Sequence, residues 1–421
     1  MFCGSCMHDN TLARGLRALG EEVTLIPTYT PIRVDEPDAS EHHVYLGGID
    51  LYLRHRSRMW RSLPRAATRW VDTPWLLRFA ARFAISNDAQ SLGELTLAML
   101  AGSAGPQREA LDELAQFIIH DLKPDIVVFS NALLAGALEA IRIEQGDYLP
   151  CPVVCLLQGD DIFLDGLVSP YRDRALSRLR NLARGFDGFL THSQFYADYM
   201  SNYLDLPRSR IEVTPLGIDL TGHDGTPKES ASSPFTIGYF ARICPEKGLH
   251  RLIEAFCILH ERQPHTRLVA AGYLGSRDRR WAEQLFRDAA DLGDAFRYLG
   301  SPATHDEKVA VLKSFDVLSV PTEYHEPKGL YVLESLANGV PVVQPRHGAF
   351  PELLDATGGG LLVEPADANK LASALERLIL DPNLRLELSR AGHAAVYQRF
   401  GLEPTAAGTR DLLKCIGLNF R

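Results

Sequence analysis

The feature that most constrains the fold is the alternation of short apolar segments with longer amphipathic segments of helical period. In the C-terminal half of the 421 residues, the segments typical of buried strands are 235–240, 267–271, 296–299, 316–320, 341–344 and 360–363. Upstream, the same pattern predicts strands at 22–26, 125–129, 151–157, 187–191 and 211–214. Such alternation is typical of parallel sheets with helices on both faces. We therefore expect an α/β protein with doubly wound, Rossmann-like sheets.

The chain is expected to divide near residue 230, because residues 221–234 are rich in Gly, Pro and Ser. The sequence predicts a first domain at 1–225, a linker at 226–234, a second domain at 235–400 and a final helix at 401–421. The first helix is expected from Asn10 to Leu19, with Asp9 or Asn10 as its cap. A doubly wound domain normally begins with a central strand. This chain begins in the loop that should follow one, so we expect that a first strand of about 10 to 15 residues is missing.

Charge and composition exclude some functions. Lys and Arg number 44 against 53 Asp and Glu, a formal net charge of −9, and nucleic acid is not an expected partner because it needs clustered cations. The N-terminus has no signal-peptide pattern, and no apolar run reaches the roughly 20 residues of a membrane span. The expected location is therefore the cytoplasm. Cys3 and Cys6 lack the second half of a zinc signature, so we interpret them as loop residues without metal.

One segment of the first half differs in charge. Eight arginines lie between Arg54 and Arg82, with Asp72 as the one acidic residue and with three of the four tryptophans. The simpler interpretation is a helical cap whose arginines are solvated and whose tryptophans pack. The alternative is contact with an anionic membrane, at its inner face, or with an anionic acceptor.

Two loops carry the residues that point to chemistry. Arg242 and Lys247 follow the strand at 235–240, at the edge where parallel sheets bind ligands, and together they can bracket a diphosphate. Glu326 lies in the loop after the strand at 316–320, and Glu334 lies eight residues later on the following helix. Carboxylates can accept hydrogen bonds from the hydroxyls of a polyol.

The start of that helix adds an anion-binding element. Gly329 and Leu330 lie there, where backbone N–H groups and the helix dipole favour phosphate oxygens. Hydroxyls of a sugar, a diphosphate and hydroxyls of a ribose occur together in a sugar nucleotide. For either Glu alone, a structural role is the better interpretation; the combination favours a sugar-nucleotide site.

At this point the sequence resembles a known family. Three motifs resemble glycosyltransferase family 4 in their order and spacing: Arg242 with Lys247, the pair Glu326 and Glu334, and a later segment His-Gly-Ala-Phe-Pro-Glu. The two glutamates lie within the segment His-Glu-Pro-Lys-Gly-Leu-Tyr-Val-Leu-Glu-Ser-Leu-Ala-Asn-Gly. That family comprises retaining, nucleotide-sugar-dependent enzymes of GT-B fold, in which two Rossmann-like domains face a central cleft. The resemblance covers the second domain, and it extends more loosely to the first. It also implies that the final helix, 401–421, crosses back to the first domain.

The resemblance implies catalytic roles in the second domain. Arg242 and Lys247 are expected to neutralise the leaving diphosphate, and Glu326 to bind donor-sugar hydroxyls at the reacting face. Glu334 is expected to bind the ribose, and Gly329 with Leu330 to donate N–H groups to phosphate.

Further substrate contacts are implied by position in the family pattern. Gly348 and Ala349 are expected to approach the donor. Gly4 and Ser5 fall in the place of a Gly-rich acceptor loop. Gln158 stands where many members have a His; it cannot serve as acid or base, but it can donate to a sugar hydroxyl. Lys328 is a second departure, because the family commonly has an aromatic residue there, and it adds positive charge beside the phosphate.

The function expected is transfer of a hexosyl unit from a nucleotide diphosphate sugar to a hydroxyl acceptor, with retention and without cofactor or metal. The alternatives are a nucleotide-sugar epimerase or phosphorylase of the same fold, or an inactive sugar-nucleotide-binding module. The motifs identify neither the base nor the sugar nor the acceptor.

Overall fold

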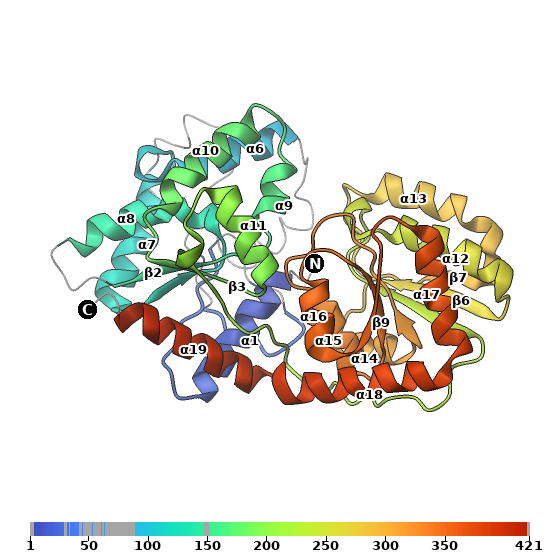
Figure 1. Ribbon diagram of the computed structural model, residues 1–421. Coiled ribbons are helices and arrows are strands. Elements are labelled where there is room, and N and C mark those ends of the chain that lie inside the picture. The colour runs from blue at the N-terminus through green and yellow to red at the C-terminus, as the bar shows by residue number, and fades with distance from the viewer. Residues whose placement is uncertain are drawn as a thin grey trace. The chain divides into compact units, whose positions relative to one another are not determined.

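The structure is a computed structural model, and it describes residues 4–28, 32, 34–41, 44, 53, 60, 63, 89–146 and 151–418. The chain forms two compact units (Figure 1). The C-terminal unit is Pro215–Thr405, and the N-terminal unit combines Phe2–Thr214 with Ala406–Arg421. Each unit has its own hydrophobic core.

The N-terminal unit is built on a four-stranded parallel sheet with the strand order β1-β2-β3-β4. The strands are β1 (Val127–Phe129), β2 (Val153–Leu156), β3 (Gly188–Thr191) and β4 (Ile211–Val213). All four residues of β2 and of β3 are buried, as expected for strands covered on both faces. The helices of this unit are α1 (Gly4–Ala18), α6 (Ala89–Leu100), α7 (Arg108–Gln116), α8 (Gly136–Gln145), α9 (Asp160–Asp165), α10 (Tyr171–Ala183) and α11 (Gln194–Leu204).

The last helix, α19 (Leu402–Leu418), contributes to the N-terminal unit. Its Leu412, Leu413 and Ile416 pack against a small cluster on the sheet formed by Val154, Leu156 and Leu190. The hydroxyl of Thr409 lies 2.6 Å from that of Thr214 at the end of β4. The C-terminal end of the chain thus covers one face of the first sheet.

The C-terminal unit contains a six-stranded parallel sheet with the order β10-β9-β8-β5-β6-β7. The strands are β5 (Phe235–Phe240), β6 (Thr266–Ala271), β7 (Phe296–Tyr298), β8 (Val317–Leu318), β9 (Val342–Pro345) and β10 (Gly360–Val363). The predicted α/β class with parallel sheets is confirmed in both units. Because β5 pairs with both β6 and β8, the strand order reverses direction there, and such a switch point is where open α/β sheets bind ligands.

Helices flank this sheet in two groups. Helix α12 packs against α17, whereas α18 packs against α15 and α16 (Figure 1). The helices of the unit are α12 (Leu249–Arg262), α13 (Arg279–Asp288), α14 (His305–Lys313), α15 (Leu330–Ala337), α16 (Phe350–Thr357), α17 (Ala368–Leu380) and α18 (Pro382–Arg399). Seven consecutive residues of α15, Tyr331–Ala337, are buried, so this helix lies inside the unit.

The structure differs from the sequence predictions near the N-terminus. Helix α1 begins at Gly4 rather than at Asn10, so Gly4 and Ser5 lie in its first turn and not in the expected acceptor loop. Asn10 is not a cap: its side chain accepts from Ala39 N at 2.8 Å and donates to Pro37 O at 3.0 Å. Asn10, one of the two residues expected as the helix cap, therefore holds a distant loop. The strand predicted at 22–26 is reduced to one bridge between Leu25 and Ser40.

The predicted linker at 226–234 packs on the C-terminal unit. The Lys228 ammonium donates to Phe315 O at 2.9 Å, and Ser232 N donates to the Asp316 carboxylate at 3.0 Å. The chain passes between the units earlier, between Thr214 and Pro215, because Leu216 and Ile218 already belong to the C-terminal core.

Two features of the sequence fall outside this description. Cys3 and most of the segment between Arg54 and Arg82, apart from Trp60 and Leu63, lie outside the described residues. Across the part of the chain that is described, no helix combines the length and apolarity needed to cross a bilayer.

Candidate functional site

The predicted donor residues meet at the switch point of the C-terminal sheet. After β5, the chain turns through Pro245–Lys247 to Gly248, which caps α12. After β8, a loop leads to Gly329 and α15. Gly248 has φ +75°, and a Cβ built there would lie 1.8 Å from Pro321 O, so glycine is required where the two loops touch. This close approach positions Lys247 beside the second loop.

A buried carboxylate forms the centre of the cluster. The Lys247 ammonium donates to Glu326 Oε2 at 2.7 Å, and the hydroxyls of Tyr324 and Tyr331 each donate to the same oxygen at 2.9 Å. The ammonium also lies 5.0 and 4.9 Å from the ring centroids of these tyrosines. Two of the predicted catalytic residues are therefore direct partners.

Glu326 is held in its ionised form. Burial alone would raise its pKa, but the charge of Lys247 and the three hydrogen bonds lower the pKa to about 2. All three hydrogen bonds fall on Oε2, and among the described residues no partner is recorded for Oε1. One oxygen is thus fixed by the protein, and the other can accept hydrogen bonds from a ligand.

Arg242 is the exposed cation of the same edge. Its Nε lies 3.2 Å from the sulfur of Cys244, whose pKa is raised by burial, so the neighbouring thiol is neutral. The charge of Lys247, in contrast, is balanced by Glu326. Arg242 therefore provides positive charge that the cluster itself does not neutralise.

The loop after β9 supports the backbone of Glu326. Ala349 N donates to Glu326 O at 2.8 Å, and a Cβ at Gly348 (φ +61°) would lie 2.6 Å from both the N and the O of Glu326. His347 Nε2 lies 2.9 Å from Thr322 O, and burial lowers the pKa of this His. The two residues expected at the donor thus lie against the loop that carries the carboxylate.

Glu334 has a partner that sequence reasoning missed. The Lys308 ammonium on α14 donates to Glu334 Oε1 at 2.9 Å, and both residues are buried. A sequence signal was available, since Lys308 lies four residues before the buried Leu312 and so shares its helix face. The sequence predicts Glu334 at the ribose, and the structure shows in addition that it belongs to a buried ion pair.

The N-terminal unit places Gln158 directly after β2, at the carboxyl edge of its sheet. The Gln158 amide nitrogen donates to Asp9 Oδ1 at 2.8 Å and to Ser130 O at 3.0 Å. The donation to a sugar hydroxyl that was predicted for Gln158 requires one of these bonds to be exchanged. Asp9, on α1, was expected only as a helix cap.

Two histidines lie at the same edge and were also missed. The rings of His8, on α1, and His192, directly after β3, have centroids 4.3 Å apart, and His8 Nδ1 lies 3.5 Å from Asp9 Oδ1. His8 is 2% exposed. The sequence predicts that the helix begins at Asn10, so it does not predict His8 and Asp9 as helix residues beside the sheet.

Metal-binding groups are not assembled in the described ranges. No group of three or more His, Cys, Asp or Glu residues in the described part of the chain could hold a metal ion. Asp160, which follows Gln158, accepts from Ala132 N at 2.6 Å and from Gln158 N at 3.0 Å. Burial raises the pKa of Asp160 to about 6. Its contacts are those of a carboxylate that fixes loop backbone.

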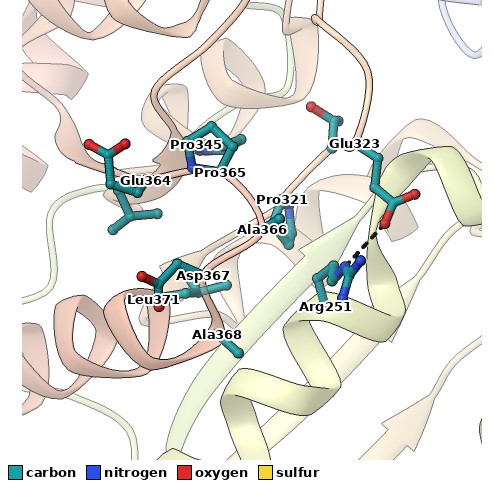
Figure 2. A pocket seen from close by; sticks show the side chains of 12 residues that line it. Arg251, Pro321, Glu323, Pro345, Glu364, Pro365, Ala366, Asp367, Ala368 and Leu371 are labelled. Carbon is teal, nitrogen blue, oxygen red and sulfur yellow. Dashed lines mark hydrogen bonds and ion pairs between the residues drawn. The ribbon is translucent and has the colours of Figure 1, made fainter.

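A separate cavity of 130 Å³ lies at the carboxyl ends of β8, β9 and β10 (Figure 2). Pro321, Pro345 and Leu371 contribute apolar walls, and Arg251 donates to Glu323 at 3.1 Å across one side. None of the predicted site residues lines it. The cavity therefore neighbours the Glu326 loop without being the predicted site.

Comparisons with known proteins cover both halves of the chain. Residues 226–394 match the family model of glycosyl transferases group 1, and residues 101–221 match that of glycosyltransferase family 4. D-inositol 3-phosphate glycosyltransferase of Corynebacterium jeikeium is 32% identical over 216 residues, 48% of this chain and 51% of that protein. Glycogen synthase of Mycobacterium tuberculosis is 28% identical over 295 residues, 69% of this chain and 68% of that protein. The chain spans about half the length of the inositol phosphate glycosyltransferases that it matches.

Solved structures share the fold. Sucrose-phosphate synthase of Thermosynechococcus elongatus superposes with a TM-score of 0.66 at 19% identity, covering 97% of this chain and 92% of its own. HepE of Anabaena, solved with UDP-glucose, gives a TM-score of 0.63 at 19% identity, covering 94% of this chain and 100% of its own. These similarities confirm the GT-B fold predicted from the sequence.

Proposed function

Because the chain belongs to the glycosyltransferases described by the group 1 and family 4 models, we propose that it transfers a hexosyl unit from a nucleotide diphosphate sugar to a hydroxyl acceptor, with retention. The observation that carries the proposal is the ionised Glu326 in the loop before α15, fixed through one oxygen by Lys247, Tyr324 and Tyr331.

The donor binds along the carboxyl edge of the C-terminal sheet. Glu326 Oε1 accepts hydrogen bonds from hydroxyls of the sugar, while the first N–H groups of α15, at Gly329 and Leu330, donate hydrogen bonds to the phosphate oxygens. Glu334 binds the ribose hydroxyls. Gly348 and Ala349 contribute indirectly, by holding the Glu326 backbone in place.

Catalysis depends on stabilising the departing diphosphate. As the glycosidic bond to phosphate breaks, negative charge grows on the leaving group, and Arg242 together with the N-terminus of α15 stabilises it. Lys247 keeps the neighbouring carboxylate in position and shares its positive charge with the same region. No resident metal or cofactor is part of this proposal, since cationic and dipolar groups supply the stabilisation.

The acceptor binds at the carboxyl edge of the N-terminal sheet. Asp9, oriented by Gln158, can accept a hydrogen bond from an acceptor hydroxyl, and His8 and His192 form the adjacent wall. Because Gln158 does not titrate, we propose that the leaving phosphate takes the acceptor proton, on the same face of the sugar. That route leads to retention.

The donor can be tested directly. HepE of Anabaena has been solved with UDP and with UDP-glucose, so UDP-glucose is the first donor to assay, followed by other UDP-, GDP- and ADP-sugars. We expect one donor to yield a glycosylated product that NMR shows to have the anomeric configuration of the donor. Binding without transfer to any hydroxyl acceptor would point to the inactive module. Release of free epimer or sugar phosphate would point to the epimerase or phosphorylase.

The cytoplasm is the proposed location, with the arginines between Arg54 and Arg82 as a contact for an anionic membrane or acceptor. Flotation with anionic liposomes, compared with neutral ones, tests the membrane contact. Absence of binding to both would contradict it.

A further inference from the structure

A buried ion pair joins α14 to α15. Lys308 is 5% exposed and Glu334 is 8% exposed, and their charged groups are 2.9 Å apart. A pair this buried is weak evidence for stability, because removing two charges from water offsets most of their attraction. A requirement for stability alone therefore does not account for Lys at this position, and the pair calls for a functional explanation.

The two carboxylate oxygens of Glu334 differ in their hydrogen-bond partners. Oε1 accepts from Lys308, whereas among the described residues Oε2 has no recorded partner. A short hydrogen bond from a buried ammonium to one carboxylate oxygen restricts the rotation of the side chain. Lys308 thus orients the Glu334 carboxylate while leaving one oxygen for another group.

The backbone of Glu334 is also anchored. Asn338, one turn along α15, donates to Glu334 O at 2.9 Å, and its amide nitrogen lies 2.8 Å from His223 Nδ1. Burial lowers the pKa of His223 to about 4, so the ring is neutral near pH 7 and its Nδ1 can accept that hydrogen bond. The helix turn that bears the carboxylate is therefore held from two sides.

We propose that Lys308 is a positioning residue for the nucleotide: it holds the Glu334 carboxylate oriented so that Oε2 accepts hydrogen bonds from the ribose hydroxyls. This inference rests on the proposed function, in which Glu334 binds the ribose. It makes a specific prediction, because a ligand without ribose hydroxyls gains nothing from the pair.

The test uses nucleotides with and without those hydroxyls. Binding of UDP and GDP is compared with binding of their 2′,3′-dideoxy forms by isothermal titration calorimetry, using the full chain. For the nucleotide that binds, we expect the wild type to favour the ribose form about tenfold or more, because hydrogen bonds to a charged group are lost in the dideoxy form. Lys308→Met should reduce this preference to less than about threefold, with little change in dideoxy affinity, and Lys308→Arg should retain most of it.

A matched control lies on the same helix. Lys313 pairs with Asp224 at 2.8 Å, but its side chain is 42% exposed, so Lys313→Met removes an ion pair of little energetic value. The control should keep the wild-type preference. If Lys308→Met does not fold, Lys308→Gln takes its place, because its amide can still donate to Glu334. This variant should still favour the ribose form over the dideoxy form, but less strongly than the wild type does.

The outcomes separate the two proposals. If a nucleotide binds the wild type and the Lys308 variants keep an undiminished preference for the ribose form, the positioning role alone is overturned. Equal loss of ribose and dideoxy binding in Lys308→Met also overturns it, because that pattern indicates general damage to the fold. No binding of either nucleotide to the wild type would contradict the proposed function, and the inference with it.

Discussion

The two sheets present their candidate residues in different electrostatic states. At the C-terminal sheet, the buried carboxylates of Glu326 and Glu334 are each paired with a lysine, at 2.7 and 2.9 Å. At the N-terminal sheet, the central group is the neutral amide of Gln158, bonded to Asp9 and bordered by two histidines. At the first edge each carboxylate is paired with a lysine, whereas at the second the Asp9 carboxylate is bonded to an amide and bordered by two imidazoles.

This difference matches the two ligands that we propose. A nucleotide diphosphate sugar always brings a charged diphosphate and a defined set of hydroxyls, which a rigid charged site can recognise. A hydroxyl acceptor brings no obligatory charge, and neutral side chains are suited to it. Substitutions at the C-terminal edge should therefore have large effects on donor use, whereas those at the N-terminal edge should have smaller effects, confined to the acceptor.

The largest effect is expected for Glu326→Gln. The change removes the charge that pairs with Lys247 and weakens the contact to the sugar, so kcat/KM should fall by about a thousandfold, the scale found when a group that stabilises the transition state is lost. Steady-state kinetics with the identified donor measure it. Glu323→Gln, on the same loop but partly exposed, is the control and should stay within a few-fold of wild type. A Glu326→Gln enzyme with near-normal kcat/KM would refute the central role of this carboxylate.

A somewhat smaller effect is expected for Arg242→Ala. Loss of this cation leaves the departing diphosphate less stabilised, so kcat should fall by about a hundredfold. The thermal midpoint should change little, because the side chain is exposed. Arg277→Ala, which removes another partly exposed arginine of the unit, should leave kcat unchanged. Equal rates for both variants would contradict the assignment of Arg242.

The next largest effect is expected in the loop after β9, which supports the backbone of Glu326. In Gly348→Ala, the new methyl would meet backbone atoms at 2.6 Å, whereas at Gly358, also at positive φ, the nearest atom to an added Cβ is Ala391 Cβ at 3.4 Å, an ordinary contact. We expect Gly358→Ala to cost about 1 kcal/mol of folding free energy, the conformational part alone. Gly348→Ala should cost about 2 kcal/mol more and should also lower kcat. Urea unfolding of both variants measures the difference, and equal losses would show that the contact does not hold the loop.

The smallest effect is expected at the N-terminal edge. Gln158→Leu removes the bonds to Asp9 and Ser130, so KM for the acceptor should rise about tenfold while donor affinity stays constant. Gln145→Leu is the control, since it also loses a buried amide bond, to Cys151 O at 2.8 Å, away from the carboxyl edge. Weaker donor binding in Gln158→Leu would break the proposed division between the two edges.

Much of the C-terminal site could be predicted from the sequence. Arg242, Lys247 and Glu326 lie in two short loops, and Glu334 lies on the helix that follows the second loop. Alternating strands and helices determine at which edge those loops meet. The fold could be predicted as well, because apolar segments of strand length that alternate with helices leave few alternatives to a parallel sheet.

The missed residues depend on contacts between distant parts of the chain. Gln158 and Asp9 are 149 positions apart, and Lys308 and Glu334 are 26 apart. No local pattern reports such contacts, since they arise when helices pack. The start of helix α1 could not be predicted from the local sequence either. Asn10 is a residue type that often caps helices, but here its side chain binds a loop.

The most direct test of the central claim compares UDP-glucose with UDP, and likewise GDP- and ADP-sugars with their diphosphates, in calorimetric titrations of the wild type and Glu326→Gln. If Glu326 recognises the donor sugar, the wild type binds one sugar nucleotide more tightly than the matching diphosphate. The variant should lose that difference while still binding the diphosphate. An unchanged difference in Glu326→Gln, or no binding of any of these nucleotides to the wild type, would contradict the account.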